Sequence, residues 1–257
     1  MPLGNQIDLA TIHAALTARE FFVVYQPIVS LRDGRCFGGE ALIRWRRKGT
    51  VVIDAADFIP FTERTPLSGT ITYWIIDTVA EELGEWLDAN PDAHISINVP
   101  PEILGRGGLE YAARKSGLRS RVKQLILEVT ERGIPDQLGL EALKGIPLTG
   151  AHVALDDTTL SGANLALLTR CPFDFVKLDG SLISELEPGR PLPSWFDGLA
   201  ALLQATPLQI IAEGVETEFQ VDALLAAGVR LAQGHHFSMP RTAANFKRYY
   251  AGMHRGD

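Results

Sequence analysis

Cysteine is scarce in this chain of 257 residues, which contains only Cys36 and Cys171. The two residues form no CxxC pair, and neither has a spacing to other cysteines or histidines that is typical of zinc ligation. The sequence therefore predicts neither a disulfide framework nor a zinc site. We expect two reduced thiols inside the fold, as is usual for a cytoplasmic protein.

Long hydrophobic runs are also missing. No apolar stretch approaches the roughly 18 residues that a membrane-spanning helix needs. Residues 1–5 show no basic segment followed by an apolar run, so a signal peptide is not predicted. The sequence thus predicts no membrane segment and a cytoplasmic location.

Positive charge is in short supply, because 24 Lys and Arg residues stand against 31 Asp and Glu residues, for a net charge of -7. A protein that binds duplex nucleic acid usually presents a basic surface, so we expect no duplex nucleic acid as a partner. An anionic substrate stays open, provided that metal ions supply the positive charge.

The sequence has no GxGxxG motif after a strand-like segment, which would favour an open doubly wound sheet. It has instead a repeated pattern, in which a short apolar run ends in a polar residue and a helix-like stretch follows. After two early strand-like segments, 21–25 and 36–45, such runs lie at 94–97, 124–127, 152–155, 173–176, 209–212 and 229–232. Eight strands alternating with helices in a chain of this length predict an α/β fold, a TIM-like (β/α)8 barrel, with the open sheet as the alternative.

Local signals refine this prediction. The Asp33-Gly34 turn predicts that the second strand returns antiparallel to the first. Helical spacing over residues 8–19 predicts a lead-in helix capped by Asp8, so we expect residues 1–20 to precede a barrel domain of residues 21–257. A polar loop is expected after residue 45, followed by a long amphipathic helix over residues 70–90.

The carboxyl ends of parallel barrel strands meet at one mouth, where active sites lie. The polar residues at the predicted strand ends are Gln26, Glu40, Asn98, Glu128, Asp156, Asp157, Lys177, Glu213 and Gln233. Asp and Asn in such places often cap a helix, and for Asn98 and Asp157 taken singly we prefer that interpretation. Glutamate is a poor cap, so the three glutamates need another explanation.

Five carboxylates in one mouth would repel one another unless cations were bound. Oxygen ligands from Asp, Glu and Asn suit Mg²⁺ or Mn²⁺, and the set is large enough for two ions bridged by Asp156 or Asp157. Two metal ions are a known device for phosphoester hydrolysis, since one activates water and both hold phosphate oxygens. Lys177, between apolar neighbours, would orient the attacking water or neutralise developing charge.

The stretch Glu40-Ala41-Leu42-Ile43-Arg44-Trp45 places a carboxylate and a guanidinium four residues apart in an apolar run. A strand would put Glu40, Leu42 and Arg44 on one face. A salt bridge between Glu40 and Arg44 is the simple interpretation. The alternative is a metal-binding Glu40 beside an Arg44 that binds phosphate with two parallel hydrogen bonds.

Together these segments resemble the EAL-domain family of bacterial cyclic-di-GMP phosphodiesterases. The matching motifs run in order over nearly the whole chain: 25–28 (YQPI), 40–45 (EALIRW), 57–60 (DFIP), 96–99 (SINV), 128–131 (EVTE), 154–157 (ALDD), 176–179 (VKLD), 212–217 (AEGVET) and 233–234 (QG). The resemblance implies a barrel whose second strand is antiparallel. It also implies hydrolysis of cyclic-di-GMP to linear pGpG with two Mg²⁺ or Mn²⁺ ions.

Roles for single residues follow from the same resemblance. One metal ion would be held by Glu40, Asn98, Glu128 and Asp156, and the other by Asp156, Asp157 and Glu213. Lys177 would contact the hydrolytic water, and Gln233 would join its hydrogen-bond network. Gln26, Leu42 and Arg44 would contact the ligand. Glu131 would stabilise the loop after the fifth strand. Glu216 would support the mouth of the barrel.

One departure from the family concerns residues 158–164. The family continues its Asp-Asp pair with a Phe-Gly-Thr-Gly-Tyr-Ser-Ser-like run, whereas this chain has Thr-Thr-Leu-Ser-Gly-Ala-Asn. Glycine permits backbone conformations that Thr and Leu resist. In the family this loop helps to place the second-metal aspartate and lies at the dimer contact. Two alternatives to an active enzyme therefore stay open, a cyclic-di-GMP receptor and a protein-interaction domain, and a homodimer is an expectation of the family.

Overall fold

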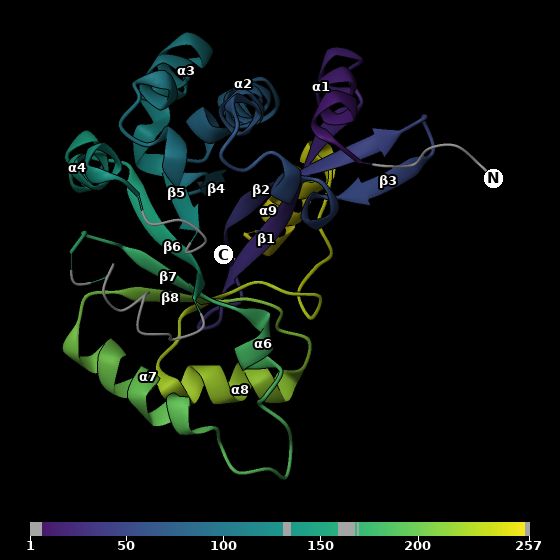
Figure 1. Ribbon diagram of the computed structural model, residues 1–257. Coiled ribbons are helices and arrows are strands. Elements are labelled where there is room, and N and C mark those ends of the chain that lie inside the picture. Colours follow the sequence, from purple (N-terminus) through teal and green to yellow (C-terminus); the bar gives the residue numbers. More distant parts are fainter. Residues whose placement is uncertain (1–6, 131–134, 159–167, 169, 255–257) are drawn as a thin grey trace.

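The computed structural model describes residues 7–130, 135–158, 168 and 170–254. In this part of the chain a single sheet closes into a barrel (Figure 1). Its strands are β1 (Phe21–Ser30), β2 (Cys36–Arg47), β3 (Val51–Asp54), β4 (His94–Val99), β5 (Leu125–Thr130), β6 (His152–Thr158), β7 (Phe175–Leu178), β8 (Gln209–Ala212) and β9 (Leu231–Ala232). The order is β1-β9-β8-β7-β6-β5-β4-β2-β3, and the additional pairing of β1 with β2 closes the barrel. The prediction of a barrel with one antiparallel strand is confirmed.

The direction of the first two strands needs one correction. β1 and β2 are antiparallel, as the turn predicted, with Gln26 opposite Glu40. β2, however, runs parallel to β4, whereas β1 is antiparallel to β9 as well. The strand that opposes the others is therefore β1 and not β2. A turn signal fixes only the relative direction of two strands, and their pairing with β4 and β9 decides which one is reversed.

The segment after β2 is also more regular than expected. Instead of a polar loop, Val51–Asp54 form the edge strand β3, which pairs with the end of β2. Lys48 and Gly49 both have positive φ angles, of 50° and 76°, and turn the chain between the two strands. Because β3 pairs with β2 alone, it lies outside the closed barrel (Figure 1).

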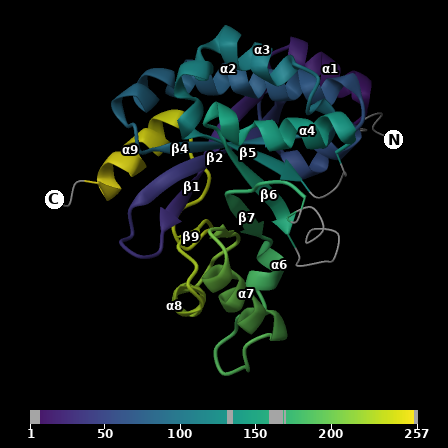
Figure 2. The same cartoon turned by 90° about the vertical axis from the view of Figure 1, so that its left-hand side faces the viewer.

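The helices cover the outside of the barrel. They are α1 (Leu9–Thr17), α2 (Pro66–Ala89), α3 (Gly108–Ser116), α4 (Gln137–Gly145), α6 (Gly180–Ile183), α7 (Ser194–Ala205), α8 (Glu218–Ala227) and α9 (Ala243–Met253). Figures 1 and 2 show α2, α3 and α4 on one side and α7 and α8 on the opposite side. No helix of the described residues combines the length and the apolar character that crossing a bilayer would require.

Local capping explains where several helices begin. The Asp8 side chain accepts a hydrogen bond from the backbone N–H of Thr11, as predicted for the first helix. Thr65 caps α2 in the same way, and Pro66 occupies its first turn, so the helix begins four residues before the predicted start at residue 70.

Ile12 of α1 is buried in the same cluster as Trp45. The domain boundary at residue 20 stays a prediction.

The packing of the barrel requires glycine at one point on β2. A Cβ atom on Gly38 would lie 2.0 Å from the backbone oxygen of His94, the residue that pairs with it on β4. Only a residue without a side chain lets the two strands approach this closely. Both Cys36 and Cys171 are buried and unpaired, as expected.

Candidate functional site

Polar side chains from neighbouring strands converge inside one end of the barrel. Asn98 on β4 pairs with Glu128 on β5, and both stand near the carboxyl ends of parallel strands. Asp156 on β6 and Lys177 on β7 occupy the corresponding places on the next strands, and Glu213 follows β8 directly. Parallel pairing in register brings these strand ends to one level, which is why residues far apart in sequence meet here.

The Lys177 ammonium lies among four carboxylates. Its Nζ atom is 3.1 Å from Glu40 Oε2, 2.8 Å from Glu128 Oε2, 2.9 Å from Asp156 Oδ1 and 2.7 Å from Glu213 Oε1. The Lys177 side chain is only 1% exposed. An ammonium group has three protons, so it cannot satisfy four carboxylates at once. Asp156 Oδ1 accordingly lies within ion-pair distance but has no hydrogen bond among the described residues.

Two amide side chains complete this cluster. Asn98 donates from Nδ2 to Glu40 Oε1 at 2.9 Å. Gln233 donates from Nε2 to both Glu40 Oε2 at 2.8 Å and Glu213 Oε1 at 3.0 Å. These hydrogen bonds hold Glu40 from two sides and link the first and the last strands of the site. The role of Gln233 in the hydrogen-bond network of the hydrolytic water stays a prediction.

Burial and crowding shift the pKa values of the cluster in different directions. Burial raises the pKa of Glu213 to about 8, against the opposing charge of Lys177. Burial, followed by the charge of Glu40, raises the pKa of Glu128 well above its usual range. Burial also acts to raise the pKa of Glu40, but Lys177 and the hydrogen bonds from Gln233 and Asn98 together lower it. Burial would lower the pKa of Lys177, yet the surrounding carboxylates raise it well above its ordinary value.

The donor chemistry of the cluster fits a hard divalent cation. Glu128 Oε1, Asp156 Oδ1 and Gln233 Oε1 are buried oxygens without hydrogen-bond partners among the described residues. Such oxygens carry lone pairs that a cation could share, and Mg²⁺ and Mn²⁺ prefer this kind of ligand. In the described residues, Asp, Glu, His and Cys form no group of three or more already arranged for a metal ion. The Lys177 ammonium lies between the four carboxylates, so cation binding requires these side chains to rearrange around it.

The proposed ligand-contacting residues have different surroundings. Gln26 is buried and donates from Nε2 to the backbone oxygen of Ser238 at 2.6 Å. Arg44 Nε lies 2.7 Å from Asp54 Oδ1 on β3, and its side chain is 17% exposed. The interpretation of Glu40 and Arg44 as a salt bridge was therefore wrong, because Glu40 pairs with Lys177. Residues four apart on a strand are separated by about 13 Å, which is too far for an ion pair.

The structure says less about the predicted roles of three other residues. Glu216 is exposed and donates its backbone N–H to Gln220 Oε1 at 2.8 Å, at the start of α8. Asp157 belongs to strand β6, but its side chain lies outside the described residues. Glu131 and most of the altered 158–164 segment also lie outside them. The roles assigned to these residues stay predictions.

A cavity of about 610 Å³ opens from the carboxylate cluster. Glu40 and Asn98 line its inner end, and Leu42 lines its wall. Contact between Leu42 and a ligand stays a prediction. Apolar side chains of α2, among them Ile71 and Ile75, form a further part of the wall. The polar residues Glu63, Arg64, Glu102, Arg106 and Asp136 also line it. Sequence reasoning missed this wall, since loop and helix residues carry no strand-end signal.

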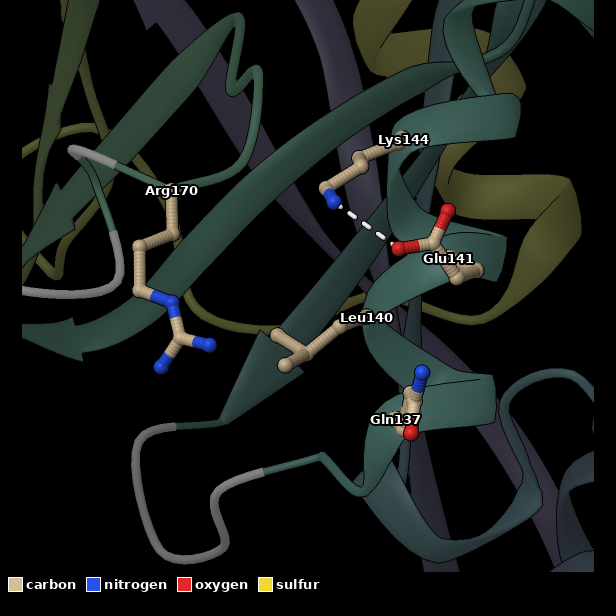
Figure 3. Close-up of a pocket in the computed structure, with 5 residues that line it drawn as sticks. All are labelled: Gln137, Leu140, Glu141, Lys144 and Arg170. Atoms are coloured by element: carbon tan, nitrogen blue, oxygen red, sulfur yellow. Dashed lines mark hydrogen bonds and ion pairs between the residues drawn. The ribbon is translucent and has the colours of Figure 1, made fainter.

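A smaller hollow of about 330 Å³ lies elsewhere, beside α4 (Figure 3). It is lined by Gln137, Leu140, Glu141, Lys144 and Arg170. Lys144 donates to Glu141 at 2.9 Å, an exposed pair within one helix. None of the strand-end acids lines this hollow, so the larger cavity is the candidate site.

The EAL domain family matches residues 10–240. The chain belongs to this family. Among the curated relatives of this EAL domain is the probable cyclic di-GMP phosphodiesterase PdeB of Escherichia coli, which is 32% identical over 238 residues. That match covers 91% of this chain and 45% of PdeB. The chain thus spans less than half the length of this relative.

Solved structures show the same relationship. The phosphodiesterase domain of PaMucR in complex with c-di-GMP superposes with a TM-score of 0.82 and is 31% identical, covering 92% of this chain and 98% of that one. The EAL enzyme Bd1971, in its form bound to cAMP and cyclic-di-GMP, gives a TM-score of 0.84 at 27% identity. This second match covers 94% of this chain and 67% of the Bd1971 chain.

Proposed function

We propose that this EAL domain hydrolyses cyclic-di-GMP to linear pGpG with the help of two divalent cations, Mg²⁺ or Mn²⁺. The observation that carries the proposal is the buried cluster of four carboxylates around Lys177. Four acids and one base leave an excess of negative charge in a site shielded from water, which is stable only with protons or cations bound. Bound cations would also offset part of the negative charge of a cyclic dinucleotide.

The cations would be held by Glu40, Asn98, Glu128 and Asp156 on one side and by Asp156, Asp157 and Glu213 on the other. When bound, they would supply Lewis-acid activation of water and neutralise charge on the phosphate. Without bound cations the surrounding carboxylates raise the pKa of Lys177 well above its ordinary value, and we assign to it the role of a positive charge next to the hydrolytic water. Gln233 holds Glu40 and Glu213 in place through its amide group.

The cavity next to the cluster supports a ligand of dinucleotide size. Its volume of about 610 Å³ lies within the range of small-molecule sites, roughly 300–1,000 Å³. Its mixed wall offers apolar surface for bases, and its inner end reaches Glu40 of the carboxylate cluster. Two proteins with similar folds, Bd1971 and PaMucR, have been solved with this nucleotide bound.

The decisive experiment incubates the purified protein with cyclic-di-GMP and Mg²⁺ or Mn²⁺, and separately with EDTA, and follows the nucleotides by chromatography. We expect pGpG only in the samples with metal. Glu40→Ala and Lys177→Ala should abolish product formation while the far-ultraviolet circular dichroism stays that of the folded protein. Glu141→Ala removes an exposed carboxylate outside the cavity and is the matched control. Full activity in either site variant would refute the assigned roles.

A receptor function is the second candidate, and the altered sequence at 158–164 favours it. A receptor would bind cyclic-di-GMP and pass the signal to a partner without cutting it. This alternative predicts a ligand-dependent rise in melting temperature, as mass action requires, but no pGpG after long incubation with metal. A protein-interaction domain that has lost the nucleotide would show neither effect. A homodimer likewise remains a proposal, which light scattering would test.

A further inference from the structure

The outer part of the candidate cavity combines charges of both signs. Arg64 and Arg106 line it together with the carboxylates of Glu63, Glu102 and Asp136. A phosphate group would be attracted by the arginines but repelled by three neighbouring carboxylates. A guanine base suits this mixture better, because its N7 and O6 atoms accept hydrogen bonds while its amino group donates one.

The two arginines of this rim differ in the contacts that their side chains make. The Arg106 guanidinium forms an ion pair with Asp136. Arg64 makes no ion pair or side-chain hydrogen bond with any residue that the structure describes, although its side chain is exposed beside the cavity. An arginine carries five N–H donors in a planar fork. The whole Arg64 guanidinium is therefore available to a ligand, whereas Arg106 already uses its Nη2 atom to bind Asp136.

The backbone fixes Arg64 in a conformation that side chains usually avoid. Its φ angle is +59°, in the left-handed region that favours glycine. The Arg64 backbone N–H donates to Glu102 Oε1 at 2.8 Å, and this contact across the rim holds the residue in place. A strained, anchored position with a free polar head is the kind of arrangement that binding sites retain.

We propose that Arg64 recognises a guanine of the bound nucleotide through the O6 and N7 atoms of that base. The inference rests on the proposed function, because it takes cyclic-di-GMP as the ligand. The phosphate to be cut would lie at the inner end with Glu40 and Asn98, so a base extends toward the outer rim. There the Arg64 guanidinium would donate two parallel hydrogen bonds to the guanine base. The methylene groups of Arg64 and the ring of Pro60 would add apolar contact with the base.

The test compares wild type with Arg64→Gly on cyclic-di-GMP and on cyclic-di-AMP, in which an amino group replaces O6. We expect KM for cyclic-di-GMP to rise about 10-fold and the preference for the guanine nucleotide to fall by a similar factor. The value of kcat should stay within about 2-fold, since Arg64 is remote from the reacting phosphate. Arg64→Lys keeps the charge but loses the fork, and it should lie between the two.

Arg19→Gly is the matched control. Arg19 has a φ angle of +56°, is exposed and lies outside the cavity lining. Both glycine variants relieve the same backbone strain, so neither should lower the melting temperature. Only Arg64→Gly should change KM. An unchanged KM in Arg64→Gly, or an equal loss for both nucleotides, would overturn the role in guanine recognition and leave the proposed hydrolysis intact.

Dissociation constants measured by calorimetry in EDTA keep the two proposals separable. If wild type binds cyclic-di-GMP but forms no pGpG, the hydrolase proposal fails, and the same comparison of the two nucleotides still decides the role of Arg64. If wild type shows neither binding nor hydrolysis, both proposals fail together. A roughly 10-fold weaker binding of cyclic-di-GMP to Arg64→Gly than to wild type supports the inference in either case.

Discussion

Lys177 Nζ lies 2.7 Å from Glu213 Oε1; Lys177 belongs to β7, and Glu213 directly follows the adjacent strand β8. This ion pair stands at the border between the two groups of carboxylates that would each hold a cation. We therefore expect the ammonium and any bound cations to compete for the same oxygen atoms. Such competition would make the response of the protein to metal ions measurable.

Lys177→Met tests this competition, because methionine has a similar length but no charge. Without metal, the substitution leaves buried carboxylates unpaired, and we expect a loss of about 3–5 kcal/mol in the free energy of unfolding. With Mg²⁺ the loss should shrink, since a cation can take the place of the ammonium. Hydrolysis should fall at least about 100-fold.

The measurement is thermal or urea unfolding of the variant with and without Mg²⁺. Lys115→Met serves as the control, since Lys115 forms an exposed ion pair with Asp77 away from the cavity. Metal should raise the melting temperature more in Lys177→Met than in the control or in wild type. An equal response of all three proteins would contradict the competition.

Glu213 predicts how stability and metal affinity depend on pH. Its pKa is raised from 4.5 to about 8, so the folded protein holds a proton in this range that the unfolded chain has released. The contribution of Glu213 to stability is therefore complete below about pH 4.5 and is lost as the pH rises through about 8. A metal ion bound by Glu213 would displace this proton, so we expect its affinity to rise over the same interval.

Melting temperatures without metal, and Mn²⁺ binding by calorimetry, would be followed from about pH 5 to about pH 9. The charged or polar groups that face Glu213 are Lys177, Asp156, Glu40 and Gln233, and they move its titration but do not reverse its direction. Glu213→Gln should flatten both profiles between about pH 6 and pH 8. Affinity that is independent of pH in wild type would be inconsistent with a protonated Glu213.

Gln233 offers a test of positioning without a change in charge. Its amide donates to Glu40 and Glu213, which come from opposite halves of the carboxylate cluster. Gln233→Leu removes both hydrogen bonds, and we expect a loss of about 10- to 100-fold in metal affinity, as is usual when a group that orients a ligand is removed. Calorimetric titration with Mn²⁺ measures this loss. Saturating metal should restore most of the activity, and a defect that metal cannot restore would argue for a direct role.

The convergence of the acids could be predicted from the sequence because parallel strands end at one level. Once Glu128, Asp156 and Lys177 were placed at strand ends, the closed barrel brought them together. The same reasoning could not find Arg64, which lies in a loop and reaches the cavity only through the folding of residues 55–72 beside β2. It also could not show which partner Arg44 chooses, because Asp54 belongs to a strand that pairs outside the barrel.

The strand direction shows a second limit. Alternation of strands and helices indicates a parallel sheet, and a tight turn indicates one antiparallel pair. Neither signal says whether β1 or β2 runs parallel to the other strands. The direction depends on the pairing of β1 with β9 and of β2 with β4, and both partners lie far away in the sequence. Pairing over long sequence separations is decided by the packing of the whole barrel.

Gly38 connects the fold to the site, because it lies two residues before Glu40 on β2. A Cβ atom in Gly38→Ala would meet the backbone oxygen of His94 at 2.0 Å, so β2 and β4 would have to separate. We expect a loss of at least about 1–3 kcal/mol in the free energy of unfolding, measured in urea. The movement of β2 also displaces Glu40 from Asn98, so metal affinity should fall together with stability.

Gly145→Ala provides the comparison within the same chain. Gly145 is the last residue of α4, and a Cβ atom there would meet nothing within 4 Å. Alanine in a helix restricts the unfolded chain, so this variant should be as stable as wild type or up to about 1 kcal/mol more stable. If both glycine variants behaved alike, the close approach of β2 and β4 would not limit the barrel. A loss confined to Gly38→Ala would show that closing the barrel and positioning Glu40 depend on the same contact.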